Sequence, residues 1–279
     1  MDRVVEGKML LAKNNEFASY KNKNFSVSCM TLLGDRKEQQ DSLGFEVDSD
    51  CAFAVLCDGM GGQSGGKSAS NLAVKCLISQ FSIIDKCSDN VSFLCDNVIA
   101  INKKVRQMSY NEKFENAGTT LVSVIVHHDK LYWCSVGDSR AYILRNEILV
   151  QLTQDQNYRS VLDGQLKDEK ITQKFYDQES RFGGALISYI GINGEPLIDY
   201  NNTALQLVEN DKIIIMSDGL YKILHDNEIE RVINNCASCE SALELLKIKA
   251  EKVAQKKAIA MDNTSVIIIK VGGNMCENN

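Results

Sequence analysis

The chain has 279 residues, of which 44% are hydrophobic and 24% charged, a composition typical of a folded protein with a substantial apolar core. Its formal net charge is −6 and it contains no basic block or Arg-rich stripe, which disfavours a nucleic-acid-binding protein. The first residues lack the apolar centre of a signal peptide, and no apolar run reaches the length of a membrane span. The sequence therefore predicts a cytoplasmic protein with no nucleic-acid partner and no membrane association.

Apolar runs rich in β-branched residues predict strands in chain order. Only His128 and Asp129 separate two of these runs, which predicts a hairpin and antiparallel pairing. The expected strands are 25–33, 51–57, 120–127, 130–136, 141–145, 212–217 and 264–270.

Helical patterns occur at about 66–81, 92–110 and 242–258, and Ser241 with Glu244 predicts a capping box at the start of the last helix. Because strands and helices come in consecutive groups and do not alternate, the sequence predicts an α+β fold. The polar segment 154–180 interrupts the strand-rich part and is interpreted as a lid or flap.

Cysteine and histidine content limits the possible chemistry. The ten Cys residues are expected to be free thiols in a reducing compartment, and the single Cys-x-x-Cys pair, Cys236 and Cys239, does not predict a zinc site. Three His residues are too few for a His-rich zinc site or a Ser–His–Asp triad. Catalysis must then depend on carboxylates, Arg, Lys or hydroxyl groups.

The stretch from Gly61 to Ser68 matches a P-loop, with Gly66 and Lys67 at the expected spacing, and Asp218 at the end of an apolar run could serve as its Walker-B acid. A P-loop fold needs a mostly parallel sheet, whereas the predicted hairpin is antiparallel. Asp58, just before the glycines, would also repel a phosphate. A P-loop nucleotide hydrolase is therefore kept as an alternative.

Four Asp residues at the ends of predicted strands indicate a metal site instead. One Asp-Gly pair alone would be a simple turn, but two of the four carry a following Gly, and Gly59 could offer its carbonyl to a cation. Hard oxygen ligands of this kind suit Mg²⁺ or Mn²⁺. The four residues are Asp58, Asp138, Asp218 and Asp262.

Arg36 follows the first predicted strand, 25–33, and Asp41 lies five residues further on. A guanidinium group can bond two phosphate oxygens at once, so Arg36 is a candidate phosphate ligand. Taken alone, it would be read as a solvated surface residue.

Together these residues resemble a family. The order is Arg36 and Asp41, then "DGMGG" (58–62), "AGTT" (117–120), "VGDSRAY" (136–142), "LTQDQ" (152–156), "SDGL" (217–220) and "DNTSV" (262–266). It is similar to the metal-dependent serine/threonine protein phosphatases of type 2C (PPM), and "DGMGG" resembles their bacterial branch. The resemblance extends from about Phe25 to Val271.

The resemblance implies a four-layer αββα sandwich of two antiparallel sheets flanked by helices, with a flap at about 154–185. It divides the chain into an N-terminal extension (1–24), a phosphatase domain (25–271) and a C-terminal tail (272–279). It places Gly66, Lys67 and Ser68 inside a helix, which would make the P-loop match a coincidence.

The resemblance also implies a role for each site residue. It makes Asp58, Asp218 and Asp262 ligands of a first metal, with Asp58 and the Gly59 carbonyl binding a second. Asp138 would share a third metal with Asp218, Arg36 would bind the phosphate, and Asp41 would lie near the metal-bound waters. Two to three Mn²⁺ or Mg²⁺ ions are expected.

Three positions depart from the family pattern: Gln39 replaces the usual Asn, Gln156 the usual His, and Met60 a His found in eukaryotic members. None is a direct metal ligand in the family, and without that His the leaving-group proton is expected from a metal-bound water.

The implied reaction is hydrolysis of phosphoserine or phosphothreonine by a metal-activated water. Phosphoprotein substrates, including a serine/threonine kinase, and a monomeric enzyme are expected, with a catalytically silent regulator of the same fold as an alternative.

Overall fold

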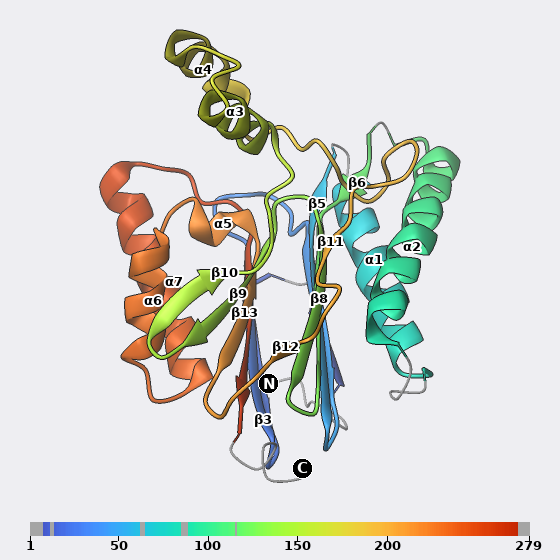
Figure 1. The fold of residues 1–279 in the computed structure, drawn as a ribbon, viewed down its shortest axis with the longest axis vertical. Helices are drawn as coiled ribbons and strands as arrows, with labels where there is room; N and C mark the ends of the chain where they lie inside the picture. The colour runs from blue at the N-terminus through green and yellow to red at the C-terminus, as the bar shows by residue number, and fades with distance from the viewer. Residues whose placement is uncertain (1–7, 12–13, 62–64, 85–88, 115, 273–279) are drawn as a thin grey trace.

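Two antiparallel β-sheets lie face to face at the centre of the protein, and helices cover the outer face of each sheet (Figure 1). The order of layers is helix, sheet, sheet, helix, which confirms the predicted αββα sandwich. The computed structural model describes residues 8–11, 14–61, 65–84, 89–114 and 116–272.

The first sheet has the strand order β1 (Lys8–Leu11), β4 (Asp41–Val47), β5 (Cys51–Met60), β7 (Leu121–His127), β8 (Lys130–Val136) and β11 (Asp199–Tyr200). Two short strands extend it, β6 (Gly118–Thr119) beside β5 and β12 (Leu205–Gln206) beside β8. The predicted hairpin joins β7 to β8 with antiparallel pairing.

The second sheet has the order β10 (Ile148–Gln151), β9 (Arg140–Arg145), β13 (Lys212–Met216), β14 (Thr264–Val271), β3 (Phe25–Leu32) and β2 (Glu16–Lys21). All of its strand pairs are antiparallel. Strands β1 and β2 fall within the stretch predicted as an N-terminal extension, and they add one strand to each sheet.

Helices α1 (Gly65–Phe81) and α2 (Asn90–Glu112) pack on the first sheet, and α6 (Asp226–Asn234) and α7 (Cys239–Lys257) pack on the second (Figure 1). The short helix α5 (Asp218–Tyr221) directly follows β13. No helix within the described ranges is both long and apolar enough to cross a bilayer.

The central strands are apolar on both faces because each sheet is buried on both sides. In β14, Ile267 and Ile269 pack between the two sheets, while Val266 and Ile268 pack under the helices. The same alternation runs along β5, so the unbroken apolar runs in the sequence mark the middle of the sandwich.

Helices α3 (Tyr158–Lys167) and α4 (Gln173–Glu179) and the 3₁₀ turn η1 (Ser180–Phe182) stand away from the sandwich (Figure 1). They occupy the part of the chain interpreted as a flap. Asn157 caps α3 by accepting a hydrogen bond from the Ser160 backbone N–H.

Two local predictions are wrong. The capping box of α7 does not use Ser241 with Glu244, because Ser238 is the N-cap and exchanges hydrogen bonds with Ser241. Asp58 does not follow its strand but lies inside β5, which continues to Met60. Cys236 and Cys239 are free thiols, as expected.

Candidate active site

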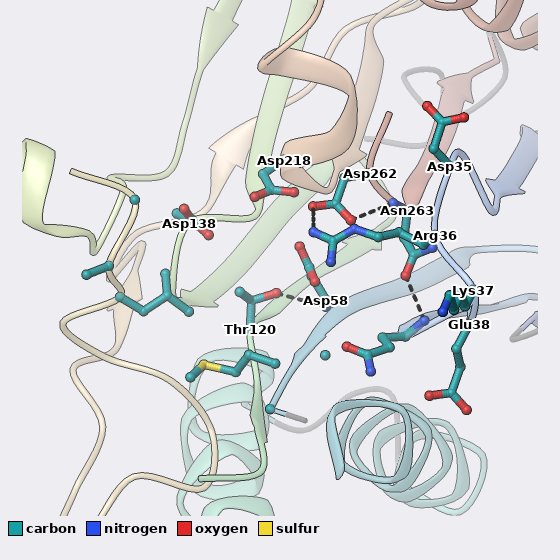
Figure 2. Close-up of a pocket in the computed structure, with 17 residues that line it drawn as sticks. Asp35, Arg36, Lys37, Glu38, Asp58, Thr120, Asp138, Asp218, Asp262 and Asn263 are labelled. Carbon is teal, nitrogen blue, oxygen red and sulfur yellow. Dashed lines mark hydrogen bonds and ion pairs between the residues drawn. The ribbon is translucent and has the colours of Figure 1, made fainter. Parts of the chain in front are cut away.

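A cavity of about 770 Å³ opens at the end of the sandwich where the two sheets meet (Figure 2). Six of the seven predicted site residues line it. Asp41 does not line it and is buried behind Asp58. The six lining residues are Arg36, Asp58, Gly59, Asp138, Asp218 and Asp262.

Asp41 and Asp58 are directly opposed across the β4–β5 pair. Like charges at opposed positions repel, and both carboxyl groups are also desolvated. Burial raises the pKa of Asp41 to about 7 and raises the pKa of Asp58 well above its usual range, and the neighbouring carboxylates raise the Asp58 value further. Ser217 donates to Asp41 Oδ2 at 2.8 Å, while Asp41 Oδ1 has no partner among the described residues.

Two threonines fix the backbone of Asp58. The Asp58 N–H donates to Thr120 Oγ1 at 2.9 Å, and the Thr119 hydroxyl donates to the Asp58 carbonyl at 2.9 Å. Since both the N–H and the carbonyl of Asp58 are held, the backbone from which its side chain enters the cavity has a fixed position (Figure 2).

Asp138 lies in the connection between β8 and β9, just after Gly137. Asn157 donates to Asp138 Oδ2 at 3.3 Å, and the Tyr221 hydroxyl donates to the Asp138 carbonyl at 2.9 Å. Burial raises the pKa of Asp138, and the charge of Asp218 raises it further.

Asp218 and Asp262 each carry a cationic partner. Asp218 begins α5 and its carboxylate contacts the Lys222 ammonium. Arg36 Nη2 lies 2.5 Å from Asp262 Oδ2 (Figure 2), and this hydrogen bond raises the pKa of Arg36.

The segment that carries Arg36 is tied to the end of β14 by Asn263. The Asn263 side chain accepts from the Gln40 N–H at 2.9 Å and donates to the Leu33 carbonyl at 2.9 Å. These bonds bracket Arg36 from both sides, so Asn263 holds it beside Asp262.

The donor set suits a hard divalent cation. Four Asp residues and Gly59 line one cavity. Burial and then the charges of neighbouring carboxylates raise the pKa of Asp58 and of Asp138, a repulsion that bound cations relieve. As the side chains of the described residues are oriented, no three of the His, Cys, Asp and Glu groups are close enough to hold one ion. Asp218 and Asp262 are instead engaged by Lys222 and Arg36.

Lys67 lies in α1 and does not line the cavity. It pairs at 3.3 Å with Glu38, which does line it. Gly66 is required for another reason: a Cβ on it would lie 2.7 Å from the Gly59 carbonyl carbon. The glycines therefore allow α1 to approach β5 closely, and nothing here supports the P-loop alternative.

Sequence reasoning assigned no role to several residues at the site. Thr120 and Asn263 lie inside quoted motifs, which is the signal that could have identified them. Asn157 and Tyr221 carry no such signal, since their importance comes from contacts across the fold. Lys222 lies four residues after Asp218, and this helical spacing is a signal that could have identified it.

An αββα sandwich with clustered carboxylates and an Arg at the meeting point of its sheets defines the class of metal-dependent phosphatases. Residues 33–251 match the family model described as protein phosphatase 2C, and the chain belongs to that family. The protein is a serine/threonine protein phosphatase, a phosphoric monoester hydrolase.

Known relatives agree with this assignment. The chain is 25% identical over 240 residues to the serine/threonine phosphatase stp of Listeria monocytogenes, covering 84% of this chain and 91% of the relative. Its fold matches the S. agalactiae serine/threonine phosphatase with a TM-score of 0.77 and 23% identity, covering 88% of this chain and 98% of that one. It also matches the catalytic domain of the phosphatase PstP, solved with two manganese ions, with a TM-score of 0.71 and 22% identity over 89% of this chain and 99% of that one.

Proposed function

We propose that the protein removes phosphate from phosphoserine and phosphothreonine side chains of proteins, using Mn²⁺ or Mg²⁺ ions bound two or three at a time in the cavity. The observation that carries this proposal is that four Asp residues, Gly59 and Arg36 line one cavity. Bound divalent cations supply Lewis-acid activation of a water molecule and offset the charge of the phosphate.

The proposed ligand roles are those that the family resemblance implies. Asp58, Asp218 and Asp262 would hold one ion, Asp58 and the Gly59 carbonyl a second, and Asp138 with Asp218 a third. This proposal is supported by the charges around two of these residues: beyond the effect of burial, Asp218, Asp138 and Asp262 raise the pKa of Asp58, and Asp218 raises that of Asp138. Because Asp58 would serve both of the first two ions, its replacement is predicted to have the largest effect on turnover.

Arg36 is proposed to bind the substrate phosphate. Its side chain is 61% exposed, and it already holds a carboxylate oxygen of Asp262 in this structure. A phosphate dianion entering the cavity offers the same kind of acceptor, with charge-assisted hydrogen bonds. Asp41 does not line the cavity, so it is proposed to act on the metal-bound waters through Asp58, which it faces across the β4–β5 pair.

We infer that the substrates include a serine/threonine kinase, which would be a natural partner for a phosphatase of this class. We also propose a monomeric, cytoplasmic enzyme with no membrane or nucleic-acid partner. The net charge of −6 supports the last of these points. The flap, at about 154–185, is proposed to border the substrate, because Gly184 and Ala185 line the cavity.

The proposal is tested by comparing two variants in the hydrolysis of p-nitrophenyl phosphate with Mn²⁺. Asp58→Asn removes the proposed bridging charge and should reduce turnover to near background. Lys67→Ala changes a residue paired only with Glu38 among the contacts described here and should leave turnover close to that of the wild type. A wild-type protein that binds Mn²⁺ but hydrolyses neither this ester nor a phosphothreonine peptide would instead support the silent regulator.

A further inference from the structure

Lys222 is a cation fixed beside one of the proposed ligands. It follows the last residue of α5 and lies four residues after Asp218, which begins that helix. Residues four apart face the same side of a helix, and the Lys222 ammonium contacts Asp218 Oδ2. The Lys222 side chain is about half exposed (52%), whereas that of Asp218 is 14% exposed.

The charge of Lys222 also acts on Asp138. The Tyr221 hydroxyl holds the Asp138 carbonyl, so α5 and the β8–β9 connection are fastened together. Asp138 and Asp218 lie near each other in the cavity (Figure 2). Burial and the charge of Asp218 raise the pKa of Asp138, and the charge of Lys222 lowers it, so the ammonium is within electrostatic range of both carboxylates.

We propose that Lys222 is a built-in counter-charge for the Asp138–Asp218 pair and competes there with a divalent cation. This inference rests on the proposed metal centre. A divalent ion bound to the same carboxylates must displace the ammonium or remain close to it, and both cost binding free energy. This position therefore binds its cation more weakly than the position at Asp58.

The pair of Arg36 with Asp262 does not have the same consequence. Arg36 lies in the β3–β4 connection and is more exposed than Lys222, at 61%. A substrate phosphate can replace Asp262 as the acceptor of the hydrogen bond that the Arg36 guanidinium donates. Lys222 caps the short helix that its partner Asp218 begins, and it does not line the cavity. A substrate phosphate in the cavity therefore cannot replace Asp218 as the partner of its ammonium group.

The test is calorimetric titration of the chelator-treated full chain with Mn²⁺. Lys222→Gln and Lys222→Met both remove the charge, and Lys222→Arg retains it. Both neutral variants should gain a Mn²⁺ equivalent or bind their weakest ion about tenfold or more tightly. Lys222→Arg should bind Mn²⁺ as the wild type does. Lys170→Gln is the matched control, because it removes a Lys paired with Asp168, neither of these two residues lines the cavity, and every Mn²⁺ affinity should stay unchanged.

The outcomes separate this inference from the metal centre itself. If the wild type binds Mn²⁺ and Asp58→Asn loses it, the centre stands. Stoichiometry and affinities that stay at wild-type values in both neutral variants then overturn the role of Lys222 alone. A wild type that binds no Mn²⁺ would overturn the metal centre and this inference together.

Discussion

Asp41 and Asp58 show how one residue pair can make a protein depend on bound cations. They are opposed on neighbouring strands, both are desolvated, and their carboxyl groups have raised pKa values. Without a cation, the folded state avoids the repulsion by keeping protons on these groups. With divalent cations in the cavity, the same carboxylates can ionise at a much smaller cost.

This predicts an unusual pH dependence for the protein in EDTA. The folded-state pKa of Asp41 is about 7, raised from 3.8, so the folded state binds more protons than the unfolded state between these values. The free energy of unfolding should therefore fall as pH rises over this range, by at most about 1.4 kcal/mol per pH unit for each such group. Urea unfolding at pH 5, 6 and 7 measures the slope, and Asp41→Asn should flatten it. Equal slopes in the two proteins would contradict the assignment.

Arg36 gives a second prediction at the scale of one residue. If it binds the phosphate in both the ground state and the transition state, Arg36→Ala should raise KM about tenfold or more and change kcat little. Steady-state kinetics with p-nitrophenyl phosphate measures both constants. Lys37→Ala is the matched control, since Lys37 lines the same cavity and the described contacts give it no ion pair with Asp262. An Arg36 variant with the wild-type KM would return this residue to a surface role.

At the scale of elements, the position of α1 depends on contact between two backbones. Gly66 in α1 lies against Gly59 in β5, and a Cβ on Gly59 would lie 2.2 Å from the Gly66 carbonyl oxygen. This contact fixes the distance between the helix and the strand that carries Asp58. It also accounts for Gly66, one of the glycines in the stretch that matches a P-loop.

Gly66→Ala should therefore destabilise the protein and weaken Mn²⁺ binding, because the new Cβ must push β5 away from α1. Gly164→Ala is the matched control. Gly164 is also helical, but a Cβ there would meet no atom within 4 Å, so Ala should be neutral or stabilise by up to about 1 kcal/mol. Thermal melts of both variants test this. A Gly66→Ala protein as stable as the Gly164→Ala protein would show that the contact is not required.

The elements that sequence analysis predicted are those with long apolar runs, and the structure has a strand or helix at each of them. Strand β4 was not predicted, since Asp41, Ser42 and Gly44 interrupt its apolar pattern. Asp41 and Ser42 are polar but are buried in the folded protein. Strand β2 was not predicted either, because it is an edge strand with alternating exposure and a polar sequence. Pairing across the sheet stabilises both strands, and a single-sequence pattern does not contain that information.

At the scale of the whole molecule, the site exists because the two sheets are packed together. Arg36 lies in the β3–β4 connection and Asp138 in the β8–β9 connection, and both connections pass from one sheet to the other. Asp58 comes from the first sheet, while Asp218 and Asp262 flank strands of the second. The order of motifs predicted which residues meet here. It could not predict Asn157, whose contact with Asp138 depends on the packing of the flap.

The proposed activity is phosphate release by divalent cations that these carboxylates hold. The most direct test measures phosphate released from a phosphothreonine peptide by the wild-type chain in excess EDTA, and again after Mn²⁺ is restored. Activity should vanish in EDTA and return with Mn²⁺, and the Asp58→Asn variant should stay inactive in both conditions. Full activity of the wild type after verified removal of metal would contradict the account.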